Sequence, residues 1–374
     1  MPGRVEPVVL LSDDEFAAWF RLVETPGLGR GPVRRLLAAC GSPDAVLSTR
    51  PTTLRELVGQ PMAGAIGTVP EGFAERLAAA LAWRGQGDQR HFLAVGAEHF
   101  PPLLLQTADP PLLLYVQGDP AVLGRRSLAI VGSRHATAQG LENARAFAKA
   151  LGEADLLVVS GLALGIDGAA HDGALAAPAG TIAVVGTGLD RVYPRAHKTL
   201  AHRIAGHGAL VSEFAPGVPA IAANFPQRNR VIAGLSLGTL VVEAALQSGS
   251  LITARMALEA GREVFAVPGS IHAPQSKGCH ALIKQGAKLV ESAADILDEL
   301  RQAAGPVAVR GGVMGPAPTN PLLDALGFEP TTLDALQART GWPTAELTAQ
   351  LLELELAGHV ARLPGGLYQR CGLA

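Results

Sequence analysis

Small polar residues and arginine gather at the points where short apolar runs end. The run Leu128–Val131 leads into Gly132-Ser133-Arg134, and Leu156–Val159 leads into Ser160-Gly161. A third small-residue cluster, Ser248-Gly249-Ser250, opens a segment with helical character. Glycine and serine let backbone approach a ligand closely, and the first turn of a helix directs N–H groups toward anions. Together the clusters predict a trough that binds an anionic ligand, whereas each cluster alone is equally typical of a tight strand–helix turn.

The segment 224–230, Asn-Phe-Pro-Gln-Arg-Asn-Arg, has an unusual composition for so short a stretch. Arginine pairs with phosphate, and phenylalanine can stack on a nucleobase. We therefore predict nucleic-acid contacts from Phe225, Arg228 and Arg230. A structural alternative remains open, in which Phe225 fills the core and Arg228 or Arg230 pairs with Glu243.

Motifs for the common phosphate-bearing cofactors are missing from the chain. There is no GxxxxGK[ST], and no GxGxxG follows the first apolar run; after a later run, Gly186 and Gly188 lack the third glycine. His197, His202 and His207 are five residues apart, so successive rings rotate by roughly 140° around a helix. We expect these histidines to lie on the surface, and we expect no cofactor, no metal and no catalytic residue.

Asp167 and His171 are four residues apart, which would bring their side chains together on one helix. The pair is compatible with acid–base catalysis or with a hydrogen bond that fixes the adjacent loop. We prefer the second interpretation.

Composition restricts the classes of protein that the chain can represent. Apolar residues make up 48% of the 374 residues and aromatic residues only 4%, so the core must be mainly aliphatic. Residues 125–300 carry 16 Lys and Arg against 14 Asp and Glu, which favours a local, shaped binding site over a broadly basic surface. Three widely spaced cysteines indicate a reducing compartment, and neither a signal peptide nor a membrane-spanning stretch is evident. We expect a cytoplasmic protein.

Residues 127–300 alternate short apolar runs with helical patterns, which predicts an α/β fold with an extended Rossmann-like parallel sheet. The predicted strands are Leu128–Val131, Leu156–Val159, Ile182–Val185, Ala209–Val211, Thr239–Val242, Val264–Val267 and Lys288–Val290. Ligands bind such sheets outside the carboxyl ends of their strands, where the small-residue clusters lie.

Four segments are predicted. Residues 1–90 form a small helical domain of the SAM or helix-hairpin-helix type, with helices near Asp13–Val23 and Pro32–Ala39. The glycine-rich turn between them is compatible with phosphate binding or with an ordinary helical hairpin. Residues 91–304 form the Rossmann-like domain, entered through a proline-rich loop and the short strand Leu112–Val116. Residues 305–319 are a linker, and 320–374 form a winged-helix domain.

Several of these motifs occur in an order that resembles the DNA processing protein A (DprA, also called Smf) family. They are Ile130–Arg134, Ser160–Asp167 with His171, Phe225–Ser236, Ser248–Ala254, Val267–Gly269 and Gly278 with Leu282–Ala287. The strong part of the resemblance covers about residues 125–300, and the flanking domains match the family's three-part layout more loosely.

The resemblance implies single-stranded-DNA binding, a homodimer formed through the Rossmann-like domain, and loading of the RecA recombinase in natural transformation. The family's DNA pocket would map onto Gly132, Ser133, Arg134, Ser160, Gly161, Phe225, Arg228, Asn229, Ser248, Gly249 and Ser250; Arg230 and Lys277 complete our predicted set. One departure is His280, where the family usually has asparagine, which puts in doubt a hydrogen bond from an amide there.

Two alternatives come from other classes of protein. Gly238-Thr239 through Glu243 is similar to the strand that carries the catalytic glutamate of nucleotide phosphoribohydrolases on a related Rossmann-like core. The residues before it, 233–238, lack the diglycine loop that those enzymes need. A scaffold for protein partners is the other alternative, and it leaves the arginine- and asparagine-rich segment 224–230 unexplained.

Overall fold

A computed structural model describes residues 11–303 except 88 and 98, together with 321–326, 331–356, 360–363 and 367–370. The chain divides into two compact units, Met1–Gly305 and Pro306–Ala374. The predicted linker and the predicted turn at residues 364–366 lie outside the described residues.

The first unit begins with six helices. They are α1 (Asp13–Val23), α2 (Arg30–Cys40), α3 (Pro43–Ser48), α4 (Pro51–Val58), α5 (Gln60–Gly67) and α6 (Phe73–Arg84). Helix α1 starts at a capping box, in which Ser12 and Glu15 bond each other's backbone N–H groups. The first two helices agree with the predicted pair to within two residues at each end.

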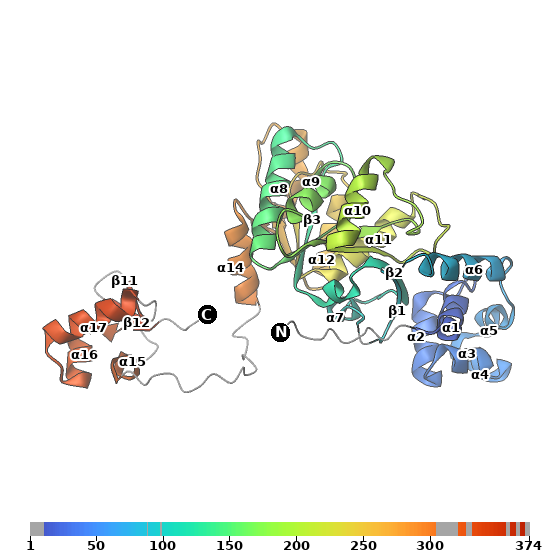
Figure 1. Cartoon of the computed structure of the whole chain (residues 1–374), viewed down its shortest axis with the longest axis horizontal. Coiled ribbons are helices and arrows are strands. Elements are labelled where there is room, and N and C mark those ends of the chain that lie inside the picture. The colour runs from blue at the N-terminus through green and yellow to red at the C-terminus, as the bar shows by residue number, and fades with distance from the viewer. Residues whose placement is uncertain are drawn as a thin grey trace. The chain divides into compact units, whose positions relative to one another are not determined.

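A nine-stranded sheet forms the centre of this unit (Figure 1). Its strands are β1 (Arg90–Ala94), β2 (Leu113–Gly118), β3 (Ser127–Val131), β4 (Leu157–Ser160), β5 (Thr181–Val185), β6 (Gly208–Ser212), β7 (Gly238–Val241), β8 (Glu263–Ala266) and β9 (Lys288–Leu289). The spatial order is β1-β2-β6-β5-β4-β3-β7-β8-β9. Every predicted strand is present, and the seven strands from β6 to β9 in this order are parallel.

The sheet as a whole is mixed, because two antiparallel strands extend the predicted parallel part at one edge. Strand β1 pairs antiparallel with β2, and β2 pairs antiparallel with β6. The segment predicted as a proline-rich loop therefore contains a further strand, β1, as well as the short helix α7 (Pro102–Leu105). Strand β1 was not predicted because it begins with Arg90 and His91, so that only its last three residues are apolar.

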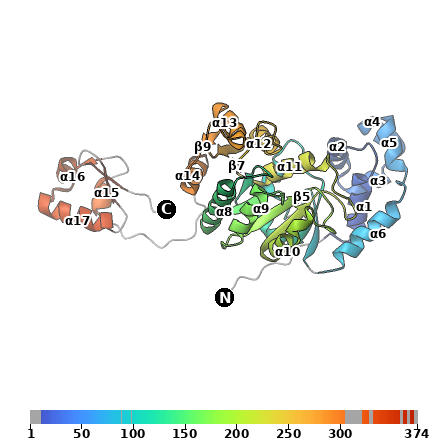
Figure 2. The same ribbon diagram turned by 90° about the horizontal axis from the view of Figure 1, so that it is seen from above.

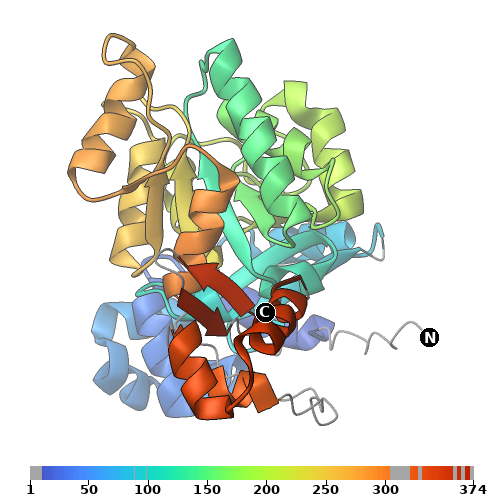
Figure 3. The same ribbon diagram turned by 90° about the vertical axis from the view of Figure 1, so that its left-hand side faces the viewer.

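Helices cover both faces of the sheet, as Figures 2 and 3 show. Residues of α8 (Ala138–Glu153), α9 (Ile166–Ala174), α14 (Ala293–Ala303) and α10 (Lys198–His207) pack on one face, where the front helices also dock. Residues of α7, α11 (Asn224–Leu235), α12 (Ser250–Glu259) and α13 (Lys277–Lys284) pack on the other. Burial on both faces explains why the central strands are continuously apolar in sequence.

The second unit has its own small core. It contains α15 (Pro321–Leu326), β10 (Thr331–Thr332), α16 (Leu333–Thr340), α17 (Thr344–Leu356), β11 (Val360–Leu363) and β12 (Leu367–Arg370). The strands pair antiparallel in the order β10-β12-β11, and Leu336, Leu351 and Tyr368 are buried between sheet and helices. This is the predicted winged-helix arrangement.

Candidate nucleic-acid interface

A cavity of about 760 Å³ lies at the carboxyl ends of β3 and β7. The chain runs outward from β3 through β4, β5 and β6 and then returns to place β7 on the other side of β3. The loops after β3 and β7 therefore diverge and leave a crevice, which is where open α/β sheets bind ligands. The sequence predicted its site at this edge.

The loop after β3 supplies one wall of the cavity. Gly132 fits only because it lacks a side chain, since an added Cβ would lie 2.6 Å from Ile166 and 2.9 Å from the Glu243 carbonyl. The Ser133 hydroxyl accepts a hydrogen bond from the His135 backbone and fixes the turn. Arg134 is exposed and makes no hydrogen bond or ion pair with another described residue, so its guanidinium donors remain available to a ligand.

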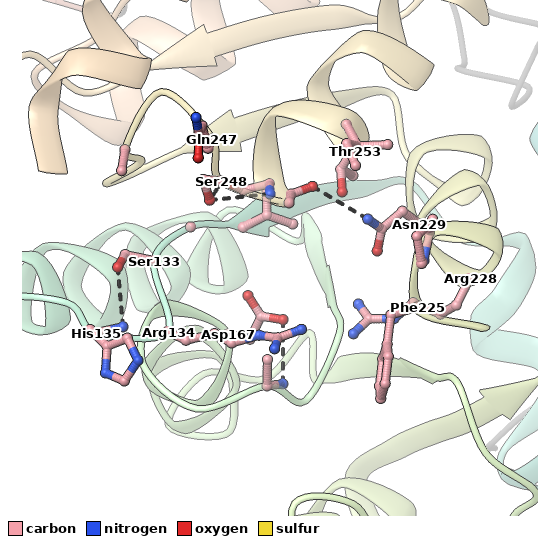
Figure 4. Close-up of a pocket in the computed structure, with 18 of the residues that line it drawn as sticks. Ser133, Arg134, His135, Asp167, Phe225, Arg228, Asn229, Gln247, Ser248 and Thr253 are labelled. Carbon is pink, nitrogen blue, oxygen red and sulfur yellow. Dashed lines mark hydrogen bonds between the residues drawn. The ribbon is translucent and has the colours of Figure 1, made fainter. Parts of the chain in front are cut away.

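The opposite wall comes from the start of α11 (Figure 4). The Phe225 ring is half-buried, and its centroid lies 5.7 Å from the Arg134 guanidinium and 5.6 Å from the Tyr193 ring. Gly186 allows this ring to approach the sheet, because an added Cβ there would be 3.2 Å from it. Phe225 is thus a partly exposed aromatic surface between a cation and a second ring.

Buried polar groups form the floor. Arg228 is 6% exposed and donates to the Gly161 carbonyl at 3.0 Å. Gly161 leaves room for the Arg228 guanidinium, which a Cβ at this position would overlap. Burial raises the pKa of Asp167, whereas Arg228 and the backbone N–H groups of Ala163 and Gly161 partly offset this effect. Burial also lowers the pKa of Arg228, and the Asp167 charge opposes that shift.

The N-terminus of α12 closes the remaining side. Ser248 and Ser250 join their hydroxyls at 2.7 Å, and the Ser250 backbone donates to Ser248 Oγ. Asn229 from α11 donates to the Gly249 carbonyl at 3.4 Å, which links the two helices across the cavity. A helix start lined by small residues carries positive potential and suits an anion such as phosphate.

Most of the predicted DNA-binding residues line this one cavity. They are Gly132, Ser133, Arg134, Phe225, Arg228, Asn229, Ser248, Gly249 and Ser250. Ser160 and Gly161 do not line it. Ser160 is fully buried and donates to the Ile130 carbonyl. The Gly161 carbonyl accepts a hydrogen bond from Arg228.

Arg230 and Lys277 lie elsewhere. Arg230 points away from the cavity and pairs with Glu213. Lys277 lines a separate apolar groove together with His280, whose Nε2 lies 3.0 Å from the Gly269 carbonyl. The histidine that replaces the family's asparagine is therefore held by backbone and is not in the cavity.

Two side-chain pairings that the sequence left open are not formed. Neither Arg228 nor Arg230 pairs with Glu243, whose carboxylate accepts hydrogen bonds from the Thr137 backbone and hydroxyl instead. Asp167 and His171 do not bond each other. Asp167 accepts from the Ala163 backbone, and the His171 ring bonds the Thr181 hydroxyl at 2.8 Å.

Among the three histidines expected on the surface, His202 and His207 are exposed, but His197 is half-buried and bonds the Leu162 carbonyl.

Several cavity residues were missed at the sequence level, among them Tyr193, His135, Gln247 and Thr253. Tyr193 carried a usable signal, because it is one of only three tyrosines and lies in a polar loop before a proline. Thr253 lies within the segment Ser248–Ala254 that carries the family resemblance, whereas His135 and Gln247 have no distinguishing pattern.

No helix in the described ranges is long and apolar enough to cross a membrane. Within the same residues, His, Cys, Asp and Glu side chains form no group of three that could hold a metal ion.

Comparison with known proteins defines the class to which this site belongs. The model of the family described as DNA recombination-mediator protein A matches residues 91–301, and that of the DprA winged helix domain matches residues 315–366. The chain belongs to the DprA/Smf family of DNA-processing proteins.

Individual relatives agree with this assignment. Protein Smf of Escherichia coli (strain K12) is 47% identical over 295 residues, which cover 76% of this chain and 79% of that protein. The X-ray structure of DprA from Streptococcus pneumoniae is 36% identical with a TM-score of 0.65, and covers 78% of this chain and 98% of its own. DprA from Helicobacter pylori, described for its single-stranded-DNA binding mode, is 29% identical with a TM-score of 0.52, and covers 57% of this chain and 97% of its own.

Proposed function

We propose that this chain binds single-stranded DNA in the cavity between β3, α11 and α12, protects it, and loads the RecA recombinase onto it during natural transformation. One observation carries the binding step: the unpaired Arg134 guanidinium lies beside the half-buried Phe225 ring at a cavity that also holds a helix N-terminus. These are complementary to a phosphate and an adjacent base. The RecA and transformation roles rest on membership of the family.

The site chemistry favours single strands over duplex. A base can stack on Phe225 only if its own face is free, whereas bases inside a duplex are already stacked on their neighbours. Ile252 and the methyl groups of Ala220 and Ala222 extend the apolar part of the cavity. The bound strand would place phosphate near Arg134 and α12, and a base on the aromatic surface.

The strand is proposed to continue past Tyr193. A second cavity, of about 540 Å³, is lined by Arg90 and by Arg191, Arg195 and Lys198, which flank the Tyr193-Pro194 segment in sequence. Arg191 is paired with Asp190, but Arg195 and Lys198 are exposed and have no hydrogen-bond or ion-pair partner among described residues. Arg195 and Lys198 are thus two available cations, and they suit the phosphates that follow the base stacked on Phe225.

An enzymatic role is not proposed. Glu243, the position that resembles the phosphoribohydrolase glutamate, does not line the cavity, and its carboxylate is engaged by Thr137 at 2.9 and 2.5 Å. The carboxylate lies against Gly140 at the start of α8, where it stabilises the helix N-terminus. A glutamate held in this way caps a helix and is not placed to act as a general base in the cavity.

A homodimer through the Rossmann-like domain is proposed at an exposed apolar groove of about 620 Å³. Its exposed apolar side chains are Leu246, Ile271 and Leu289. Leu289 belongs to β9, the edge strand of the sheet, so a second copy could cover both the side chains and the edge in a two-fold contact. Light scattering should show a dimer at micromolar concentration, and Leu289→Arg should yield a monomer. A parent protein that is already monomeric would exclude this interface.

The division into a helical domain at 1–90, a Rossmann-like domain at 91–304, a linker at 305–319 and a winged-helix domain at 320–374 is retained as a proposal. So is a cytoplasmic location, where genomic DNA and recombinase are found.

Titration of labelled oligothymidylate and of a duplex of equal length, at several salt concentrations, tests the binding proposal. On single strands the slope of log affinity against log salt is about −0.7 per phosphate contact, so three or four contacts predict a slope of about −2 to −3. Equal affinity for duplex at every salt concentration would contradict the stacking model. Incubation with nucleoside monophosphates should release no free base, and such release would instead favour the phosphoribohydrolase alternative.

A further inference from the structure

Arg230 lies on the side of α11 away from the DNA cavity. Successive helical residues are about 100° apart, so Arg230 is about 140° from Phe225 and about 160° from Arg228. Its guanidinium donates to the Asp109 carbonyl at 2.6 Å and pairs with the Glu213 carboxylate. One helix therefore presents DNA-facing residues on one side and an intramolecular contact on the other.

The contact continues into the front helices. Arg30, the first residue of α2, bonds the Asp109 carboxylate at 2.7 Å and Glu213 at 3.2 Å. Arg34, one turn later, bonds Asp109 at 2.9 Å. We call Arg30, Arg34, Asp109, Glu213 and Arg230 the ion-pair cluster. It joins α2, the loop before β2, the loop after β6, and α11.

The interior of this cluster is largely shielded from water. The side chains of Arg230 and Glu213 are 15% and 12% exposed, and that of Arg30 is 30% exposed. Burial lowers the pKa of Arg230, although Glu213 and Asp109 oppose this shift, and Arg30 and Arg34 hold the pKa of Asp109 below its ordinary value against the effect of burial. Charge-assisted hydrogen bonds with fixed geometry restrain the elements that carry them more firmly than exposed ion pairs do.

Glu213 is the central member. Arg30 and Arg230 bond different oxygens of its carboxylate, so the front helix and α11 are connected through a single side chain. Glu213 also begins the loop that leads to Ala220 and Ala222, which line the DNA cavity. Loss of Arg30 would leave Glu213 with one cation and would loosen both this loop and α11.

We propose that Arg30 is a positioning residue for the DNA site: it acts through Glu213 and Arg230 to hold α11, and with it Phe225 and Arg228, in the binding arrangement. This rests on the proposed function, because the affected ligand is single-stranded DNA. Arg30 does not line the cavity and is not expected to touch DNA.

The test compares Arg30→Ala with Arg35→Ala in the full chain. Arg35 lies on the same helix, is exposed, and has no hydrogen-bond or ion-pair partner among described residues. Arg35→Ala therefore removes the same charge as Arg30→Ala but leaves the ion-pair cluster intact. Arg30→Ala should bind labelled oligothymidylate about three- to tenfold more weakly than the parent, whereas Arg35→Ala should bind like the parent. Unchanged affinity in Arg30→Ala would overturn the proposal.

The salt dependence separates positioning from direct contact. A residue that only positions others releases no counterion, so the slope of Arg30→Ala should equal that of the parent. A slope shallower by about 0.7 would mean that Arg30 touches a phosphate, and would overturn the proposal. Glu213→Gln, which keeps size and removes charge, should weaken binding in the same direction, and serves if Arg30→Ala fails to fold.

Hydrogen exchange gives an answer that does not depend on DNA. Amides of α11, residues 224–235, should exchange faster in Arg30→Ala than in the parent or in Arg35→Ala. Faster exchange confined to α2 would mean that Arg30 stabilises only the front helices, which would overturn the proposal. If the parent itself fails to bind oligothymidylate, the proposed function fails, and exchange in α11 alone then decides whether Arg30 holds that helix.

Discussion

The two sides of helix α11 use the same residue type in opposite ways. On the cavity side, Arg228 is buried as part of the floor, and Arg134 opposite it keeps its donors free beside Phe225. On the other side, Arg230 joins Arg30 and Arg34 around two carboxylates. An arginine is available to a ligand when folding places no carboxylate beside it. Whether a carboxylate lies there depends on residues that are distant in sequence.

The largest expected effect in DNA binding follows from this difference. Arg134→Ala should cost about 1.5–3 kcal/mol of binding free energy, because a charge-assisted hydrogen bond to phosphate is lost. Its salt slope should become shallower by about 0.7, and its melting temperature should barely change, since Arg134 is exposed and unpaired. Salt-dependent binding and thermal denaturation, measured on the same preparation, check the expected affinity and the expected melting temperature.

Arg230→Ala is the matched control for Arg134→Ala, because it removes an arginine that lies on the other side of α11 from the cavity. It should lower the melting temperature, because Glu213 loses a buried partner, and it should leave the salt slope unaltered. If Arg230→Ala rather than Arg134→Ala flattened the salt slope, the roles assigned to the two sides of α11 would be reversed.

Phe225→Ala should have a slightly smaller effect, about 1–3 kcal/mol for one stacked base. The salt slope should stay the same, because stacking releases no counterion. Melting should shift little, since the ring is half-buried and outside the packed core. Phe225→Leu, which keeps apolar volume without an aromatic face, is the control. Full binding by the leucine variant would mean that Phe225 contributes bulk and not stacking.

The sequence predicted the parallel sheet and the place of the site because both depend on local pattern. Apolar runs locate the strands, and the small residues after Val131 line the cavity, whereas Gly161, which follows Val159 and Ser160, contacts Arg228 instead. Phe225, Arg228 and Asn229 also fall where predicted, because one helix start carries them into the cavity.

What could not be predicted depends on partners brought together by folding. Arg230 appeared equivalent to Arg228 within one short segment, yet its partners are Glu213 and the Asp109 loop, the latter more than a hundred residues away. Lys277 is adjacent to a family motif but faces an apolar groove. Strand β1 was not predicted because this edge strand starts with two polar residues and has a shorter apolar run than the central strands.

His171 on helix α9 provides a pH test of a third situation, a polar group that is buried and incompletely bonded. His171 is fully buried; its Nδ1 must donate to Thr181, because the Thr181 hydroxyl already donates to the Val158 carbonyl, and Nε2 has no partner among described residues. Burial lowers the pKa of His171 to about 3. Below the ordinary pKa of histidine the unfolded chain therefore binds the extra proton, and stability falls as pH falls.

Between pH 6.5 and pH 5 this histidine should remove roughly 2 kcal/mol from the free energy of unfolding. Urea denaturation of the parent and of His171→Gln at pH 7, 6 and 5 measures the difference. Asp167 titrates in the opposite sense because burial raises its pKa, so the two proteins are compared with each other at each pH. Parallel pH dependences would show that His171 is not held neutral.

The smallest effect is expected from removing the winged-helix unit, whose surface contrasts with both sides of α11. A winged helix that reads DNA places its recognition helix against phosphates, which requires cations there. Helix α17 has neither Lys nor Arg, and its Glu346, Glu353 and Glu355 are all exposed, so it should repel a strand. Truncation after Gly305, at the boundary between the two compact units, should change oligothymidylate affinity by less than about twofold, within roughly 0.4 kcal/mol. A folded truncated protein that lost most of its affinity would place essential DNA contacts on the winged helix and would confine the cavity around Arg134 to a secondary role.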